Sequence, residues 1–194
     1  MTKWSVVACD QYTSELNYWN EVESIVGDSP STYRLIFPEI FLEEENQEDR
    51  IKAINNKMKE YLENNILSSQ GPCFIYLERE TSSTNMRKGL VLAVDLEKYD
   101  YHKGSKSLIR ATEGTVLERI PPRVKIRENA SIELPHIMLL IDDDKKTVIE
   151  PLADKKKYLD KIYDFDLMLN GGHIRGYRIT DEDTIISILQ AFEQ

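Results

Sequence analysis

The stretch CFIYLERETSSTNMRKGLVLAVDL, residues 73–96, indicates the class of fold. Two runs rich in β-branched and other apolar residues, residues 73–80 and 88–96, flank a polar loop of Thr, Ser and Asn. This pattern predicts two neighbouring antiparallel strands. Elsewhere strand-like runs also come in adjacent pairs and do not alternate strictly with helices. The sequence therefore predicts an α+β fold with a mixed, largely antiparallel sheet and flanking helices.

A second hairpin is predicted around the NGG of residues 170–172, because Asn-Gly supplies the positive φ values of tight turns. Its expected strands are FDLML, residues 165–169, and HIRGYRI, residues 173–179. Further strands are expected at residues 4–9, 33–37, 136–141 and 147–152, the last two as a hairpin. Apolar residues at three- and four-residue spacing predict helices at residues 14–27, 46–67, 154–165 and after the capping residue Thr180.

Length and composition predict a single α+β domain over residues 1–194, and the last predicted helix, which runs almost to Gln194, indicates that the natural protein continues. The chain has 194 residues, of which 41% are hydrophobic, so it can bury a sizeable core. No apolar run approaches the ~20 residues of a membrane span, and the N-terminal residues show no secretory signal pattern. We therefore expect a cytoplasmic protein that has no membrane partner.

The charge distribution predicts a small anionic ligand. A net charge of -9 disfavours a nucleic-acid partner, because phosphate backbones attract positive surfaces. Residues 103–127, in contrast, carry seven Lys or Arg and two Glu, a local charge of +5, which leaves -14 on the rest of the chain. A local positive field on an acidic protein suits a small anion better than a long polyanion.

Candidate binding residues lie within this basic stretch, SLIRATEGTVLERIPPRVKIREN, residues 107–129. Arg110, Thr115, Arg119 and Arg123 are the predicted anion-binding residues, since the arginine fork suits bidentate binding of phosphate or carboxylate. Glu113 lies among them and could orient an arginine, hold a metal or accept a proton from a substrate hydroxyl. The alternative is a solvated basic surface that balances the acidic remainder of the chain.

Asp10 is a second candidate catalytic residue. It follows the strand-like residues 4–9 and precedes the helix expected at residues 14–27, a place where α/β sheets position ligand groups. The alternative is an Asp turn followed by a helix cap at Ser14. His173 is interpreted as a hairpin residue, and no metal-ligating group is predicted because no Cys and His have zinc-ligand spacing.

Several phrases resemble the domain-of-unknown-function 1015 family of bacteria and archaea: CDQYTS, DSPSTYRLIFPEI, GLVLAVDLEKYDY, SLIRATEGT and ERIPPRVKIREN. The resemblance covers nearly the whole chain. Asp10, Glu113, Thr115 and Arg119 match the family pattern, whereas Thr112 stands where the family has His.

The resemblance implies that full-length members are about twice as long and carry an Asp-Gly-x-His segment after the region matched here. That segment is similar to a motif of the ParB-like fold, which free-serine kinases share. By this analogy Glu113 would act as the base for a hydroxyl, and the arginines would steady the transferring phosphate. A C-terminal half of the same protein is then the expected partner.

These observations lead to two hypotheses about function. The first is the ligand-binding half of a small-molecule phosphotransferase, a kinase acting on a small hydroxyl substrate, with a nucleotide and Mg²⁺ as candidate cofactors. The second is a non-catalytic module that binds an anionic metabolite, or a purely structural or interaction domain. The absence of a Walker-type phosphate loop from the sequence favours the second hypothesis.

Overall fold

The computed structural model describes residues 1–8, 12, 14–111, 114, 116–134 and 136–193, except for the side chain of Arg119. By their contacts the residues form two compact units. The first unit consists of Met1–Ser69, Val116–Met138 and Phe165–Gly172, and the second of Gln70–Thr115, Leu139–Asp164 and His173–Gln194. The expected single domain over residues 1–194 stays a prediction.

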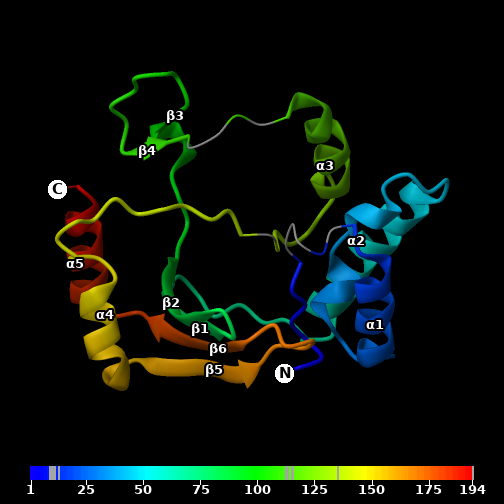
Figure 1. Cartoon of the computed structure of the whole chain (residues 1–194), viewed down its shortest axis with the longest axis horizontal. Coiled ribbons are helices and arrows are strands. Elements are labelled where there is room, and N and C mark those ends of the chain that lie inside the picture. Colours follow the sequence, from blue (N-terminus) through cyan, green and yellow to red (C-terminus); the bar gives the residue numbers. More distant parts are fainter. Residues whose placement is uncertain (9–11, 13, 112–113, 115, 135, 194) are drawn as a thin grey trace. The chain divides into compact units, whose positions relative to one another are not determined.

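Helices and strands alternate irregularly along the chain (Figure 1). The α-helices of the described residues are α1 Leu16–Val26, α2 Gln47–Glu63, α3 Ile120–Arg127, α4 Glu150–Lys155 and α5 Glu182–Phe192. The strands are β1 Phe74–Thr81, β2 Thr84–Val91, β3 Tyr99–Asp100, β4 Ile109–Arg110, β5 Asp160–Asp166 and β6 His173–Ile179. Short 3-10 helices lie at Thr32–Leu35, Glu39–Phe41, Leu96–Lys98, Leu117–Arg119 and Lys156–Tyr158.

A four-stranded antiparallel sheet, in the order β2-β1-β6-β5, forms the centre of the second unit. In this sheet Tyr76 of β1 lies opposite Leu90 of β2 on one side and Tyr177 of β6 on the other. The strands β3 and β4 form a separate parallel pair of two residues each. The α+β class and the largely antiparallel sheet are therefore confirmed.

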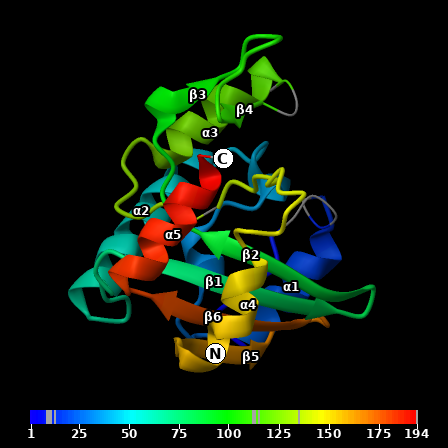
Figure 2. The same cartoon turned by 90° about the vertical axis from the view of Figure 1, so that its left-hand side faces the viewer.

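One face of this sheet carries the core of the second unit. Tyr76, Tyr177 and Ile179 of the sheet are buried together with Val148, Leu152 of α4 and Ile188 of α5. Figure 2 shows α4 and α5 lying against the strands. Alternation of side chains along β1 brings Tyr76 and Glu78 to this same face. A carboxylate thus lies beside the apolar core.

The first unit has two apolar clusters, each built on one helix. Trp19, Val22 and Val26 follow one side of α1 and pack with Met168 of the hairpin turn. Ile54, Met58 and Tyr61 of α2 pack with Leu35. The predicted helices at residues 14–27 and 46–67 are confirmed, because each apolar stripe has a core to pack against.

Both predicted hairpins, around residues 81–87 and 170–172, are present. In the second, the first strand is Asp160–Asp166 and not the predicted residues 165–169. β1 and β2 pair as expected, and β6 covers the predicted residues 173–179. Of the helix expected at residues 154–165, only the end of α4 and the 3-10 helix Lys156–Tyr158 are present. From Asp160 onward the prediction is wrong, because β5 pairs with β6 along Asp160–Asp166. Pairing with a strand elsewhere in the chain overrides the local helical pattern.

The strands predicted at residues 4–9 and 33–37 are wrong in every residue that the structure describes. At Thr32–Leu35 the chain forms a 3-10 helix, because the Ser31 side chain accepts a hydrogen bond from Tyr33 N. Trp4 O and Val6 N instead bond to the backbone and side chain of Thr32, so this segment joins no sheet.

The hairpin predicted from residues 136–141 and 147–152 is also wrong. The described residues of the first segment form no strand, and the second overlaps α4. Pro151 lies in the first turn of α4, where a missing N–H costs nothing. The expected cap of the last helix shifts by one residue, since Asp181, not Thr180, accepts a hydrogen bond from Thr184 N.

Candidate functional site

The basic stretch consists of two parts with different surroundings. Its later part, on α3 in the first unit, is paired with carboxylates. Arg123 Nη2 lies 3.2 Å from Glu39 Oε1, and Lys125 Nζ lies 2.9 Å from Glu48 Oε1. Arg127 Nε lies 3.4 Å from Glu133 Oε1. These pairs are exposed, so each contributes at most about 1 kcal/mol, but together they balance the charge of α3.

Three cations at and just before the start of the basic stretch form no ion pair with a described residue. Lys103, Lys106 and Arg110 are exposed, and none of them forms an ion pair with a residue that the structure describes. All three lie in the second unit, in or next to the loop between β3 and β4, hereafter the basic loop (residues 99–111). The structure thereby separates the cations that are available to a ligand from those engaged within the chain.

Hydrogen bonds around Asp100 shape the basic loop. Its Oδ1 accepts from the backbone N of His102 at 2.9 Å and lies 2.6 Å from His102 Nδ1. The backbone donor of His102, then its side chain and Ser105, lower the pKa of Asp100 to about 2. Tyr99 and Asp100 pair in parallel with Ile109 and Arg110, which closes the loop at its base.

A hollow of about 250 Å³ lies within the basic loop. Its lining includes Lys103, Arg110, Asp100, His102 and Ser105, so two cations face one carboxylate. The Asp100 carboxylate is held by His102 and Ser105, and Gly104 has a φ of 85°, which favours glycine at this turn. Lys103 and Arg110 thus both line the same hollow, together with the Asp100 carboxylate.

A second hollow, of about 440 Å³, shares Asp100 with the first. It is lined by Tyr99 and Leu108 together with Glu97, Lys98 and Ser107. Ser107 Oγ donates a hydrogen bond to Lys98 O, which ties the two sides of the loop together. The two hollows thus adjoin at Asp100, one lined mainly by polar and charged residues and the other also by Tyr99 and Leu108.

The predicted site residues are placed unevenly. Asp10, Glu113 and Thr115 lie outside the described residues, as does the side chain of Arg119. Arg110 lies in the second unit and lines the smaller hollow, whereas Arg123 lies in the first unit and pairs with Glu39. The predicted convergence of these residues on one ligand therefore stays a prediction.

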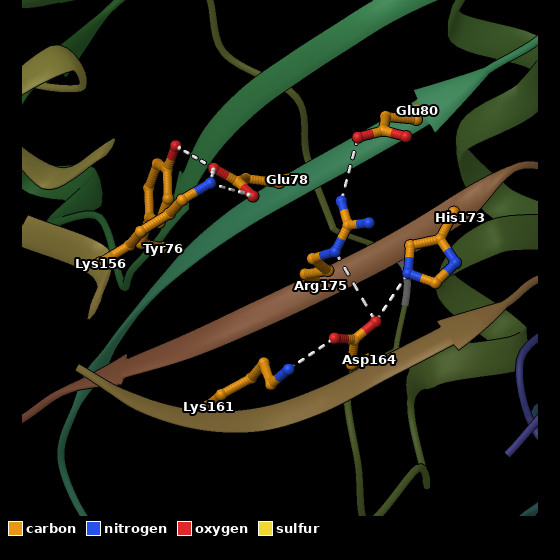
Figure 3. Close-up of polar contacts among 8 residues, drawn as sticks. All are labelled: Tyr76, Glu78, Glu80, Lys156, Lys161, Asp164, His173 and Arg175. Atoms are coloured by element: carbon orange, nitrogen blue, oxygen red, sulfur yellow. Dashed lines mark hydrogen bonds and ion pairs between the residues drawn. The ribbon is translucent and has the colours of Figure 1, made fainter. Parts of the chain in front are cut away.

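Sequence reasoning missed a buried ion pair on the sheet (Figure 3). Glu78 is 1% exposed, and its carboxylate lies 2.7 Å and 3.0 Å from Lys156 Nζ. Tyr76 Oη donates to the same carboxylate at 2.9 Å, and burial together with this hydrogen bond raises the pKa of Tyr76. The alternation along β1 could have revealed it, since Glu78 falls on the inward face with Tyr76.

A second polar cluster lies further along the same sheet (Figure 3). Asp164 Oδ1 lies 2.6 Å from His173 Nε2 and 3.7 Å from Arg175 Nε, and Asp164 Oδ2 lies 2.6 Å from Lys161 Nζ. Arg175 Nη1 also lies 3.0 Å from Glu80 Oε1. Hydrogen bonds from Lys161 and then His173 lower the pKa of Asp164. His173 begins β6, consistent with its interpretation as a hairpin residue.

The described part of the chain contains neither a cluster of metal-ligating side chains nor a membrane-spanning helix. Within the described residues, no three His, Cys, Asp or Glu side chains are grouped so that they could hold a metal ion. Among the described helices, none combines the length and apolar composition that a membrane-spanning helix requires.

The structure defines an α+β protein with an exposed loop whose Lys103, Lys106 and Arg110 form no ion pair with a described residue, and comparison with known proteins gives its family. A family model described as "Protein of unknown function (DUF1015)" matches residues 1–194. The chain therefore belongs to the DUF1015 family. No protein with a curated description and no solved structure matches it.

Proposed function

We propose that this chain binds a small phosphate-bearing anion in the basic loop. The observation that carries the proposal is the contrast between Lys103 and Arg110, which form no ion pair with a described residue, and the paired cations of α3. Like charges that line one hollow repel one another, and a bound anion would relieve that repulsion.

The chemistry of the two hollows narrows the ligand class. The Arg110 guanidinium offers a planar fork for two phosphate oxygens, and Lys103 offers a compact point charge. Tyr99 and Leu108 line the adjoining hollow, where the ring or apolar part of a ligand would be removed from water. A nucleotide or a phosphorylated metabolite with an apolar part has this arrangement of groups.

The more specific proposal is that the chain is the ligand-binding half of a small-molecule phosphotransferase. Glu113 follows Arg110 by three residues and would accept the proton of the substrate hydroxyl, with Asp10 as the second catalytic carboxylate. Thr115 and Arg119 would contact the transferring phosphate, and the C-terminal half of the family protein would complete the site. A nucleotide and Mg²⁺ are the cofactors that such a transfer requires.

A structural role for the later part of the basic stretch is the alternative that one observation favours. Arg123, Lys125 and Arg127 are all engaged with carboxylates of the first unit. These cations would then balance the charge of α3, and only the basic loop would bind a ligand.

The test is thermal unfolding of the chain with inorganic phosphate, ADP and ATP, and of the variants Lys103→Glu and Arg110→Glu. An anion present at a hundred times its dissociation constant stabilises by about 2.7 kcal/mol, which a melting curve detects. We expect both variants to lose this stabilisation. Lys59→Glu, an exposed cation on α2, is the matched control and should keep it.

Transfer itself is tested separately, with labelled ATP and a panel of small alcohols, on the wild type and on Glu113→Gln. Label transfer that Glu113→Gln abolishes, while ligand stabilisation remains, would support catalysis. Ligand stabilisation without transfer would support the non-catalytic module. If no phosphate compound changes the melting temperature of the wild type, the basic loop does not bind anions and the proposal is wrong.

A further inference from the structure

Five consecutive apolar residues, 137–141, are exposed in the segment between α3 and α4. The exposed fractions in this apolar run are Ile137 81%, Met138 77%, Leu139 49%, Leu140 81% and Ile141 40%. A soluble protein rarely exposes such a run unless a partner covers it. Its composition is typical of a β-strand, yet it belongs to no strand of the described residues.

The apolar run ends at an acidic segment. Asp142 is exposed, and the next residue, Asp143, begins a turn by accepting hydrogen bonds from Val148 N and Thr147 Oγ1. Lys146 closes the turn through its N–H to Asp143 O and has a φ of 56°. Asp142 is therefore the last residue that could continue an extended pairing, and its carboxylate lies directly after the apolar residues.

The sheet of the second unit has two edges, and their charges differ. The edge strand β2 contains Arg87 and Lys88, both exposed, and no carboxylate, and it ends in Gly89, Leu90 and Val91. The other edge strand, β5, contains three Asp and one Lys. Among the described residues β2 pairs with β1 alone, so its outer backbone groups offer a template for another strand.

We propose that the apolar run pairs in antiparallel register with β2 of a second copy of this chain. Leu139 would lie opposite Val91, Leu140 opposite Leu90, and Asp142 opposite Lys88. In this register apolar residues meet apolar residues, and the carboxylate meets the ammonium group. The one cation of β5, Lys161, is already paired with Asp164, whereas Lys88 of β2 forms no ion pair with a described residue, so charge favours β2 over β5 as the partner of Asp142.

The partner of the apolar run is a second copy, because the chain contains both the apolar run and the outer edge of β2 but does not pair them within one molecule. Leu139, Leu140 and Ile141 of the run belong to the same unit as β2, yet they remain exposed and β2 has no second neighbour in the described sheet. A twofold axis would let each copy cover the other, which forms two identical ribbons and closes the assembly as a dimer. Leu140 would extend the sheet face on which Leu90 packs against the core.

Charge reversal with rescue tests this pairing by size-exclusion chromatography with light scattering. We expect the wild type to be a dimer. Asp142→Lys and Lys88→Asp should each weaken dimerisation by about tenfold or more, because each of the two ribbons of the dimer would then contain a pair of like charges directly opposite one another. Combining the two substitutions should restore the dimer. Asp144→Lys, beyond the start of the turn, is the control and should remain dimeric. A monomeric wild type, or a folded double variant that stays monomeric, overturns the proposal.

Disulfide trapping provides a readout that does not depend on these charges. In a chain with Cys9→Ser and Cys73→Ser, the substitutions Leu139→Cys and Val91→Cys should give a covalent dimer on a non-reducing gel, since directly opposed strand residues are close enough for a disulfide. A covalent monomer would show that the run pairs with its own β2, and no cross-link would show that it does not pair there. Either result overturns the proposal. Leu139→Cys with Arg79→Cys, on the central strand β1, is the control that should not cross-link.

Discussion

The sheet and the basic loop of the second unit use charged residues in opposite ways. On the sheet, Glu78 is buried with Lys156, and Asp164 is held by Lys161, His173 and Arg175. In the basic loop, Lys103 and Arg110 are exposed and form no ion pair with any residue that the structure describes. Charges of the first kind are paired within the fold, whereas charges of the second kind are exposed and are the ones that we propose bind a ligand.

Removing Lys156 should give the largest effect on stability. Lys156→Met leaves the Glu78 carboxylate buried without its cation, and breaking a buried pair in this way costs about 3 kcal/mol, at the lower end of the usual range because Lys156 is partly exposed. Urea unfolding measures the loss. Glu78→Leu together with Lys156→Met should recover most of it, since the pair is then replaced by apolar groups. If Lys156→Met costs no more than a surface substitution, the buried pair does not stabilise the fold.

The sheet should also be sensitive to one added methyl group. A Cβ at Gly176 of β6 would lie 2.1 Å from the Tyr163 ring, so Gly176→Ala must displace that ring and should cost about 2 kcal/mol. Gly89→Ala is the matched control, because Gly89 of β2 also lies opposite Leu77 but has nothing within 4 Å of its added Cβ. Equal melting temperatures for the two variants would contradict the close packing of Tyr163 on Gly176.

Charge reversal in the basic loop should leave stability almost unchanged. We expect Lys103→Glu and Arg110→Glu to change the free energy of unfolding by no more than about 0.5 kcal/mol without ligand, as for other exposed residues. The contrast with Lys156→Met would sharpen the distinction between the two regions. A loss as large as that of Lys156→Met in either variant would instead assign the loop cations to the fold.

The smallest effect concerns acid and the Asp100 turn. Hydrogen bonds from His102 and Ser105 lower the pKa of Asp100 to about 2 in the folded loop, whereas Asp in an unfolded chain has a pKa of about 3.9. The ionised carboxylate should therefore stabilise the folded loop at pH values above about 3.9. This contribution is lost as the pH falls through about 2. Carboxyl chemical shifts measured during an acid titration give the midpoint. His102→Ala removes the side-chain contact but keeps the backbone donor, so the midpoint should rise only part of the way towards 3.9. An Asp100 midpoint near 3.9 in the wild type would contradict the turn geometry.

Local patterns along the chain determined the parts of the fold that are decided between neighbouring residues. The apolar stripes of residues 14–27 and 46–67 predicted α1 and α2, and the two β-rich runs at residues 73–96 predicted the antiparallel pair of β1 and β2. Asn-Gly chemistry placed the turn of the β5–β6 hairpin, where Leu169, Asn170 and Gly172 have positive φ. The same local patterns predicted a ligand site in the basic stretch, which stays a prediction.

Only the tertiary structure decided which partner each segment and each charge finds. β5 formed where a helix was predicted because β6 supplies its hydrogen bonds, and Ser31 turned a strand-like segment into a 3-10 helix. Nothing within residues 107–129 distinguishes Arg110 from Arg123 or Arg127, since the carboxylates of Glu39 and Glu133 that pair with the latter two lie elsewhere in the sequence. The Arg123–Glu39 ion pair and the β1–β6 strand pair join residues distant along the chain, so their formation depends on folding and not on local pattern.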